Sequence, residues 1–146
     1  MKFVYRFLFG LHLFVGLGAI CGGGATILNP QEPLGMPVDV LKNSPFSNFL
    51  IPGIILFTII GLGNAFSALT LHRKSRFQGY ISSVFSWALI IWIVVQCIMI
   101  NSIAFPHVLF FGIGVAEAIL SAFVLFDQDL FPANIIVVIY RYVKLG

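Results

Sequence analysis

The chain has 146 residues, of which 60% are hydrophobic and only 9% charged, and its mean hydropathy is +1.05. Soluble domains carry about 25% charged residues, so the composition excludes a soluble globular protein and indicates an integral membrane protein. Because a helix needs about 20 residues to cross the hydrocarbon core, the length allows four spans and one substantial loop. We therefore expect a single all-α domain, residues 1–146, built as a four-transmembrane-helix bundle.

The first predicted span covers residues 7–25, an apolar run that follows a basic start and is interrupted only by His12. Such a start could also be a signal peptide, and Cys21 raises the lipoprotein version of that reading. Lipoprotein processing requires a small residue before the cysteine, whereas this chain has Ile20 there. We therefore predict a transmembrane helix.

Small residues recur at helical spacing on two faces of this span. The sets are His12, Gly16, Ala19 and Gly23 on one face, and Gly18 with Gly22 on another. Small residues let helix backbones approach each other in a membrane, so we expect close helix packing on either side.

Three further spans are predicted at about 49–71, 80–100 and 105–126. The long connection before residue 49 carries four prolines and several apolar residues, so we expect it to fold back as an outer cap. The tail, residues 133–145, is too short to span, and its Tyr, Arg and Lys residues favour an interfacial helix.

The basic residues predict the topology. In this arrangement Lys42 lies on one side, and on the other lie seven residues: Lys2, Arg6, Arg73, Lys74, Arg76, Arg141 and Lys144. The positive-inside rule then predicts a multi-pass cell-membrane protein with both termini and the 72–79 loop in the cytoplasm. The cap and the 101–104 turn would face outward.

Residues 55–69 align without gaps to residues 108–122, and the alignment pairs Asn64 with Glu117. Two parallel copies of a helical hairpin would explain the match, although apolar runs also align by chance.

The candidate intramembrane polar site consists of Glu117, His12 and Asn64. At about 1.5 Å of rise per residue, all three lie at a similar depth of roughly 10–13 Å. A carboxylate exposed to lipid is costly, so Glu117 must face the bundle. The site could bind a proton or ion, because a close Glu–His pair could share a proton near neutrality. The preferred interpretation is a polar clasp that fixes helix register, because interhelical hydrogen bonds are a common use of such residues.

A candidate outer polar group consists of Gln96, Asn101, Cys21 and Cys97. The amides could receive the backbone of the cap. The two thiols could form a disulfide or redox pair on the oxidising side, but independent thiols are the preferred interpretation because no CxxC motif is present.

No motif for a metal, a cofactor or a catalytic nucleophile is found. The three His and two Cys are widely spaced, unlike HExxH or paired CxxC sites, and no Ser, His and acid arrangement stands out. We therefore predict no cofactor and favour a protein that is not an enzyme.

A set of loop motifs carries a resemblance. They are Asn29-Pro30, Leu34-Gly35-Met36-Pro37, Ser44-Pro45-Phe46 and Phe49-Leu50-Ile51-Pro52-Gly53, with Trp92-Ile93 and Gln96 further on. The chain thereby resembles an uncharacterised family of small four-helix bacterial integral membrane proteins and, more distantly, DoxX-like membrane proteins. The resemblance implies a four-helix membrane fold and transfers no catalytic residue.

Three functional hypotheses follow. The preferred hypothesis is that the chain is a non-catalytic accessory or scaffold subunit of a larger membrane assembly. The first alternative is a small oligomeric proton-linked transporter or channel centred on Glu117, and the second is a DoxX-like redox subunit. The expected partners are the lipid bilayer and another membrane protein or further copies of the chain, with no nucleic acid.

The predicted topology can be checked by cysteine-accessibility labelling in intact cells. Asn43→Cys should react with an impermeant reagent added outside, whereas Ser75→Cys should react only after permeabilisation, because the basic loop is held on the inner side. Labelling of Ser75→Cys from outside would disprove the orientation.

Overall fold

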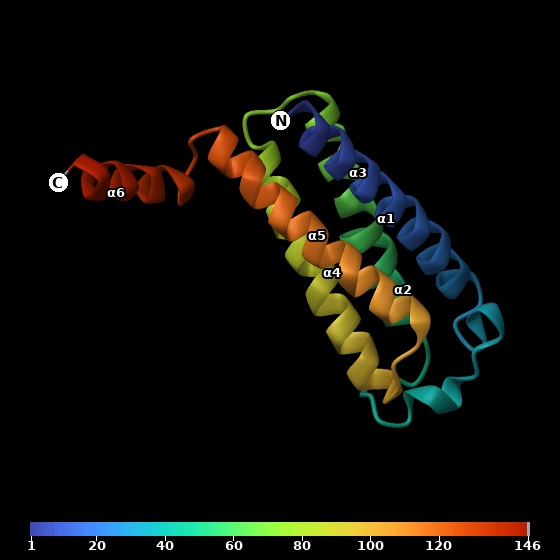
Figure 1. Ribbon diagram of the computed structural model, residues 1–146. Coiled ribbons are helices and arrows are strands. Elements are labelled where there is room, and N and C mark those ends of the chain that lie inside the picture. The colour runs from blue at the N-terminus through green and yellow to red at the C-terminus, as the bar shows by residue number, and fades with distance from the viewer. Residues whose placement is uncertain (146) are drawn as a thin grey trace.

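The computed structural model describes residues 1–145, and within them the secondary structure is entirely helical. Four long helical stretches run side by side, with the cap at one end and the N-terminus at the other (Figure 1). The elements are α1 (Lys2–Leu28), η1 (Pro33–Gly35), η2 (Val38–Leu41), α2 (Leu50–Ile55), η3 (Leu56–Leu62), α3 (Gly63–His72), α4 (Gln78–Ile100), α5 (Phe105–Asp127) and α6 (Ala133–Leu145).

The four predicted long apolar helices are confirmed, with ends within about five residues of the prediction. Four stretches, Lys2–Leu28, Leu50–His72, Gln78–Ile100 and Phe105–Asp127, are long and apolar enough to cross a membrane. Local signals set the turn between the last two. Asn101 ends α4 in the left-handed conformation, with φ 50°. The start of α5 is capped by a hydrogen bond from the backbone N–H of Ala104 to His107 Nδ1, 3.0 Å.

The second span is not a uniform α-helix. Its central part, η3, is a π-helical segment of seven residues between α2 and α3. π-Helical segments are rare, and those that occur are often found at functional sites. Here the segment ends just before Asn64, and its Ile60 carbonyl accepts the side-chain amide of Asn64 at 2.8 Å. The sequence pattern did not predict this interruption.

Among the glycines, the closest approach to the backbone of a neighbouring helix is between α1 and the second span. A Cβ atom on Gly23 would lie 2.6 Å from the backbone nitrogen of Phe57, and one on Gly16 would lie 2.9 Å from that of Ala65. The face predicted from His12 to Gly23 is therefore the one that packs closely. The expected second face does not pack closely: Cβ atoms on Gly18 and Gly22 would lie 3.8 Å from the Phe110 ring and 3.7 Å from the Leu56 side chain, which are ordinary contacts.

The connection before α2 folds into the expected compact cap. Its two ends are joined by a hydrogen bond from the backbone N–H of Phe49 to the carbonyl of Pro30, 2.9 Å. Leu41 is 2% exposed and anchors η2 on the bundle. Two of the apolar cap residues, Leu34 and Met36, are instead exposed, and Leu34 lies in the left-handed conformation.

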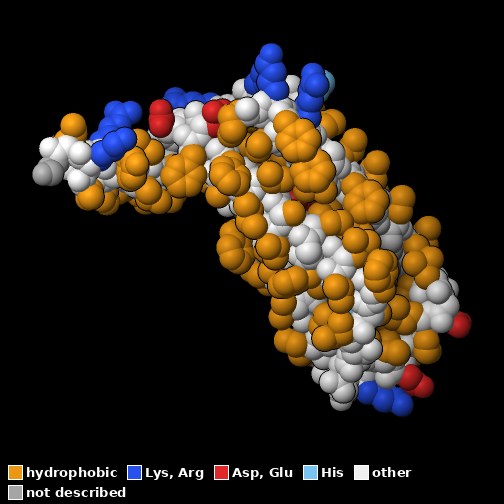
Figure 2. Space-filling view, in the orientation of Figure 1, with side chains coloured by type: hydrophobic (Ala, Val, Ile, Leu, Met, Phe, Trp, Pro, Cys, Tyr) orange, Lys and Arg blue, Asp and Glu red, His pale blue; other side chains and the backbone are white. Residues whose placement is uncertain are grey.

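Helix α6 extends away from the bundle instead of joining it (Figure 1). It is anchored at its start, where Ala133 is buried and the Tyr80 hydroxyl donates to the carbonyl of Phe131 at 2.6 Å. In Figure 2 its basic side chains lie on the same side as the basic end of the bundle, while its apolar side chains lie beneath them. This geometry fits the predicted interfacial helix.

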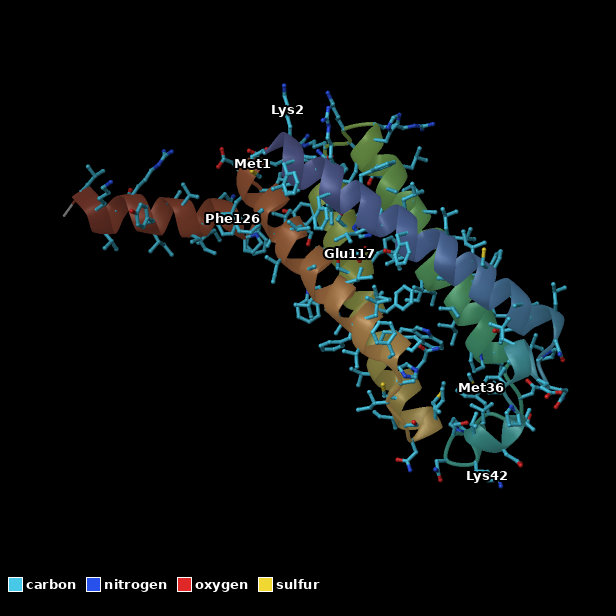
Figure 3. The ribbon with its side chains drawn as sticks, turned by 45° about the vertical axis from the view of Figure 1, so that its right-hand side comes forward. Met1, Lys2, Met36, Lys42, Glu117 and Phe126 are labelled. Carbon is cyan, nitrogen blue, oxygen red and sulfur yellow. The ribbon has the colours of Figure 1, made fainter. Side chains whose placement is uncertain are left out.

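Charged side chains are concentrated at the two ends of the molecule, and the side of the bundle in Figure 2 is largely apolar. Lys2 and Lys42 mark opposite ends in Figure 3. An apolar belt between two polar ends is what a bilayer requires.

The tight contact of α1 predicts a large difference between two glycine substitutions in the same helix. Gly23→Ala should lower the stability of the purified protein by about 1–3 kcal/mol, because the new methyl group would meet backbone atoms that cannot rotate away. Gly10→Ala is the control, since nothing lies within 4 Å of its Cβ position. Equal unfolding transitions for the two variants in detergent would contradict the packing described here.

Candidate functional site

Three buried polar side chains from three helices meet inside the bundle. They are His12 of α1, Asn64 of α3 and Glu117 of α5, and each is 0% exposed. His12 Nδ1 lies 2.7 Å from Asn64 Oδ1 and 3.3 Å from Glu117 Oε1. Figure 3 shows Glu117 well inside the bundle, between the ends marked by Lys2 and Lys42. The structure thus brings together all three residues of the intramembrane site that the sequence suggested.

The hydrogen bonds of Asn64 determine where the histidine hydrogen lies. Asn64 Nδ2 donates to the carbonyl of Ile60 at 2.8 Å, so the amide oxygen is the atom that faces His12. His12 Nδ1 must then carry the hydrogen and donate it to Asn64. In the neutral imidazole this leaves Nε2 as the proton acceptor.

The rest of the cluster has hydrogen-bonding capacity that the protein does not use. Within residues 1–145, Glu117 Oε1, Glu117 Oε2 and His12 Nε2 have no hydrogen-bond partner, and neither does the buried Trp92 Nε1 of α4. Buried polar atoms are normally satisfied. The carboxyl of Glu117 therefore lies beside the imidazole without a hydrogen bond to it, whereas His12 and Asn64 are hydrogen-bonded to each other.

The cluster has two arrangements of equal net charge. In one, Glu117 is protonated and His12 is neutral. In the other, Glu117 is a carboxylate and His12 is an imidazolium whose Nδ1 lies 3.3 Å from Glu117 Oε1. Both arrangements avoid an isolated charge in the apolar interior, which is the costly state.

The two aligned segments contribute equivalent positions to this site. Asn64 and Glu117, which the internal alignment pairs, both face His12 of α1. The glycines one turn earlier, Gly61 and Gly114, are also both buried. The aligned faces are therefore the inward faces of their helices.

A group of buried serines was missed by the sequence analysis as part of the site. Ser67 Oγ lies 3.0 Å from Ser82 Oγ, and Ser86 Oγ donates to the Ser82 carbonyl at 2.6 Å. These three and Ser121 are each 0% exposed. The signal that could have found them is spacing, since Ser67 follows Asn64 by three residues and Ser121 follows Glu117 by four.

The outer polar group does not form a site. Cys21 and Cys97 are both free thiols, Cys21 being exposed and Cys97 half-buried. Gln96 is half-buried, and Asn101 is exposed where it ends α4. In the described chain, the side chains of Gln96 and Asn101 form no hydrogen bond with the cap, because the cap closes on its own backbone and packs through Leu41. No three His, Cys, Asp or Glu residues gather as a metal site within residues 1–145.

Comparisons with known proteins give no match, whether with family models, with curated proteins or with solved structures.

The hydrogen-bond pattern predicts that Asn64 matters more for stability than Glu117. Asn64→Leu removes the acceptor of a buried imidazole N–H and should cost about 1–3 kcal/mol. Glu117→Gln should preserve the unfolding transition, because an amide has nearly the shape of a protonated carboxyl. Thr58→Val, at an exposed position of η3, is the control for changes in the same span. Thermal unfolding in detergent gives the ranking, and an Asn64→Leu protein as stable as wild type would contradict it.

Proposed function

We propose that this chain is a small proton-linked membrane protein, a transporter or a channel, in which the cluster of Glu117, His12 and Asn64 takes up and releases one proton. The supporting observation is the carboxyl of Glu117, which is fully buried, 3.3 Å from an imidazole nitrogen and without a hydrogen bond of its own. A carboxyl that only joined helices would be expected to complete its hydrogen bonds.

The buried serines support a route between the cluster and the basic end of the bundle. Ser67 and Ser121 each lie about one helical turn, roughly 5 Å, beyond Asn64 and Glu117 towards that end. Ser67 then reaches Ser82 of the neighbouring helix at 3.0 Å, and either hydroxyl could be the donor. Hydroxyls both donate and accept, so the bond between Ser67 and Ser82 can reverse, whereas Ser86 and Ser121 donate to carbonyls of their own helices.

The second candidate is the non-catalytic accessory or scaffold subunit. It is favoured by the complete enclosure of the cluster, since all three side chains are 0% exposed and the bond between His12 and Asn64 joins α1 to α3 as a clasp would. A DoxX-like redox role has less support, because the two cysteines are unpaired.

Infrared spectroscopy of the purified protein in lipid tests the proton-binding proposal directly. We expect a buried-carboxyl band whose intensity changes over the pH range in which the protein stays folded, and we expect Glu117→Gln to abolish it. Glu32→Gln, in the exposed part of the cap, should leave it unchanged. Proton flux into liposomes driven by a potassium diffusion potential should be lost in the same Glu117→Gln variant.

A band that is constant over this pH range, with equal flux in wild type and Glu117→Gln, would refute the proton-linked role. A stoichiometric partner retained on purification in mild detergent would then support the accessory subunit.

A further inference from the structure

A cavity lies at the basic end of the molecule, away from the intramembrane cluster. It has a volume of about 740 Å³ and is bounded by the start of α1, the end of α3, the start of α4 and the end of α5. Its polar lining includes Lys2, Arg6, His72, Lys74, Gln78 and Asp127.

The charge of the cavity favours an anion. Lys2, Arg6 and Lys74 contribute three permanent positive charges, whereas Asp127 is the one acidic residue in the lining and its carboxylate already accepts a hydrogen bond from Tyr5 Oη at 2.8 Å. No carboxylate lies within 4 Å of any of the three basic side chains in the described chain. Arginine and lysine without protein counter-ions are the groups that bind phosphate in proteins.

The start of α4 adds two features that point to a ligand. No side chain caps this helix N-terminus, and the N–H of Gln78 donates to the carbonyl of Ser75 at 3.1 Å. The positive end of the helix dipole lies here. Gln78, the first residue of the helix, lines the cavity at 4% exposure, and its side-chain oxygen has no partner within residues 1–145. A hydroxyl or amine attached to the bound anion could satisfy this oxygen after local adjustment of the amide.

The surroundings of the cavity indicate where the anion comes from. Phe9 and Leu71 form its apolar wall, and Phe3 and Phe7 are exposed on the adjacent surface of α1, stacked 5.7 Å apart. Lys2 lies at the end of the apolar belt, near the end of α5 at Phe126 (Figure 3), which is the level of lipid headgroups in a bilayer. An anion with an attached acyl chain therefore fits both the basic cavity and the apolar surface beside it.

We propose that this cavity is a binding site for the phosphate headgroup of one anionic phospholipid, held by Lys2, Arg6 and Lys74, with the acyl chains along the N-terminal part of α1. The site is independent of the Glu117 cluster. It also differs from the diffuse attraction of basic side chains to a membrane surface, because it predicts one tightly bound lipid.

Native mass spectrometry of the full chain, purified in mild detergent and mixed with phosphatidylglycerol or phosphatidylcholine, tests this site. Wild type should retain one phosphatidylglycerol and no phosphatidylcholine. The variant Lys2→Gln/Lys74→Asn should bind phosphatidylglycerol about tenfold more weakly. Asn is chosen at position 74 because Lys74 has a φ of 52°, a conformation that Asn tolerates.

Arg141→Gln/Lys144→Gln is the matched control, since it removes the same charge from exposed positions of α6 outside the cavity. It should bind phosphatidylglycerol as wild type does. Equal weakening in both double variants, or no weakening in either, would overturn the proposal in favour of surface attraction alone.

Glycerol 1-phosphate distinguishes a lipid from a free phosphate. If it displaces the lipid only at concentrations far above those of phosphatidylglycerol, the lipid assignment is supported; if it competes at equal concentration, the site binds soluble phosphates and the assignment is wrong. Should Lys2→Gln/Lys74→Asn fail to give the wild-type unfolding transition, Arg6→Gln in the same assay decides the outcome.

Discussion

The close approach of α1 to the second span is the contact on which the rest of the structure depends. At Gly16 and Gly23 there is room for hydrogen but not for a methyl group, because backbone atoms of Ala65 and Phe57 occupy the space. In a membrane, packing of this kind replaces the hydrophobic effect as the force that joins helices. The same approach places His12 2.7 Å from Asn64. Larger side chains on this face would separate the helices and leave both polar groups without partners.

The buried cluster divides into a satisfied part and an unsatisfied part. Asn64 receives the His12 hydrogen and donates to the carbonyl of Ile60, so this pair is complete. Glu117 only approaches the imidazole, at 3.3 Å, and neither of its oxygens is bonded within residues 1–145. In an apolar interior, the energy of a carboxyl without hydrogen bonds depends strongly on whether it is protonated. This asymmetry is the reason for preferring a proton-binding role over a purely structural one.

The two ends of the molecule differ in chemistry. The basic end combines a cavity, the uncapped start of α4 and the base of α6, whereas the opposite end is closed by the cap through the bond between Phe49 and Pro30. The buried serines lie on the basic side of the cluster. The residues proposed for the proton route and those proposed for lipid binding therefore both lie towards that end. They involve different residues and can be separated experimentally.

Residue types and their spacing were enough to predict a membrane protein with four long apolar helices, a short helical tail and the candidate cluster, because hydropathy and the cost of a buried charge depend on residue type and position alone. Tertiary structure decided which faces met. It selected the Gly16 face of α1 over the Gly18 face, turned Leu34 outward and left Cys21 and Cys97 apart. It also introduced the π-helical segment before Asn64 and closed the basic cavity from four helices. The choice of face and the basic cavity depend on contacts between segments distant in sequence, and periodicity along one helix carries no information about such contacts.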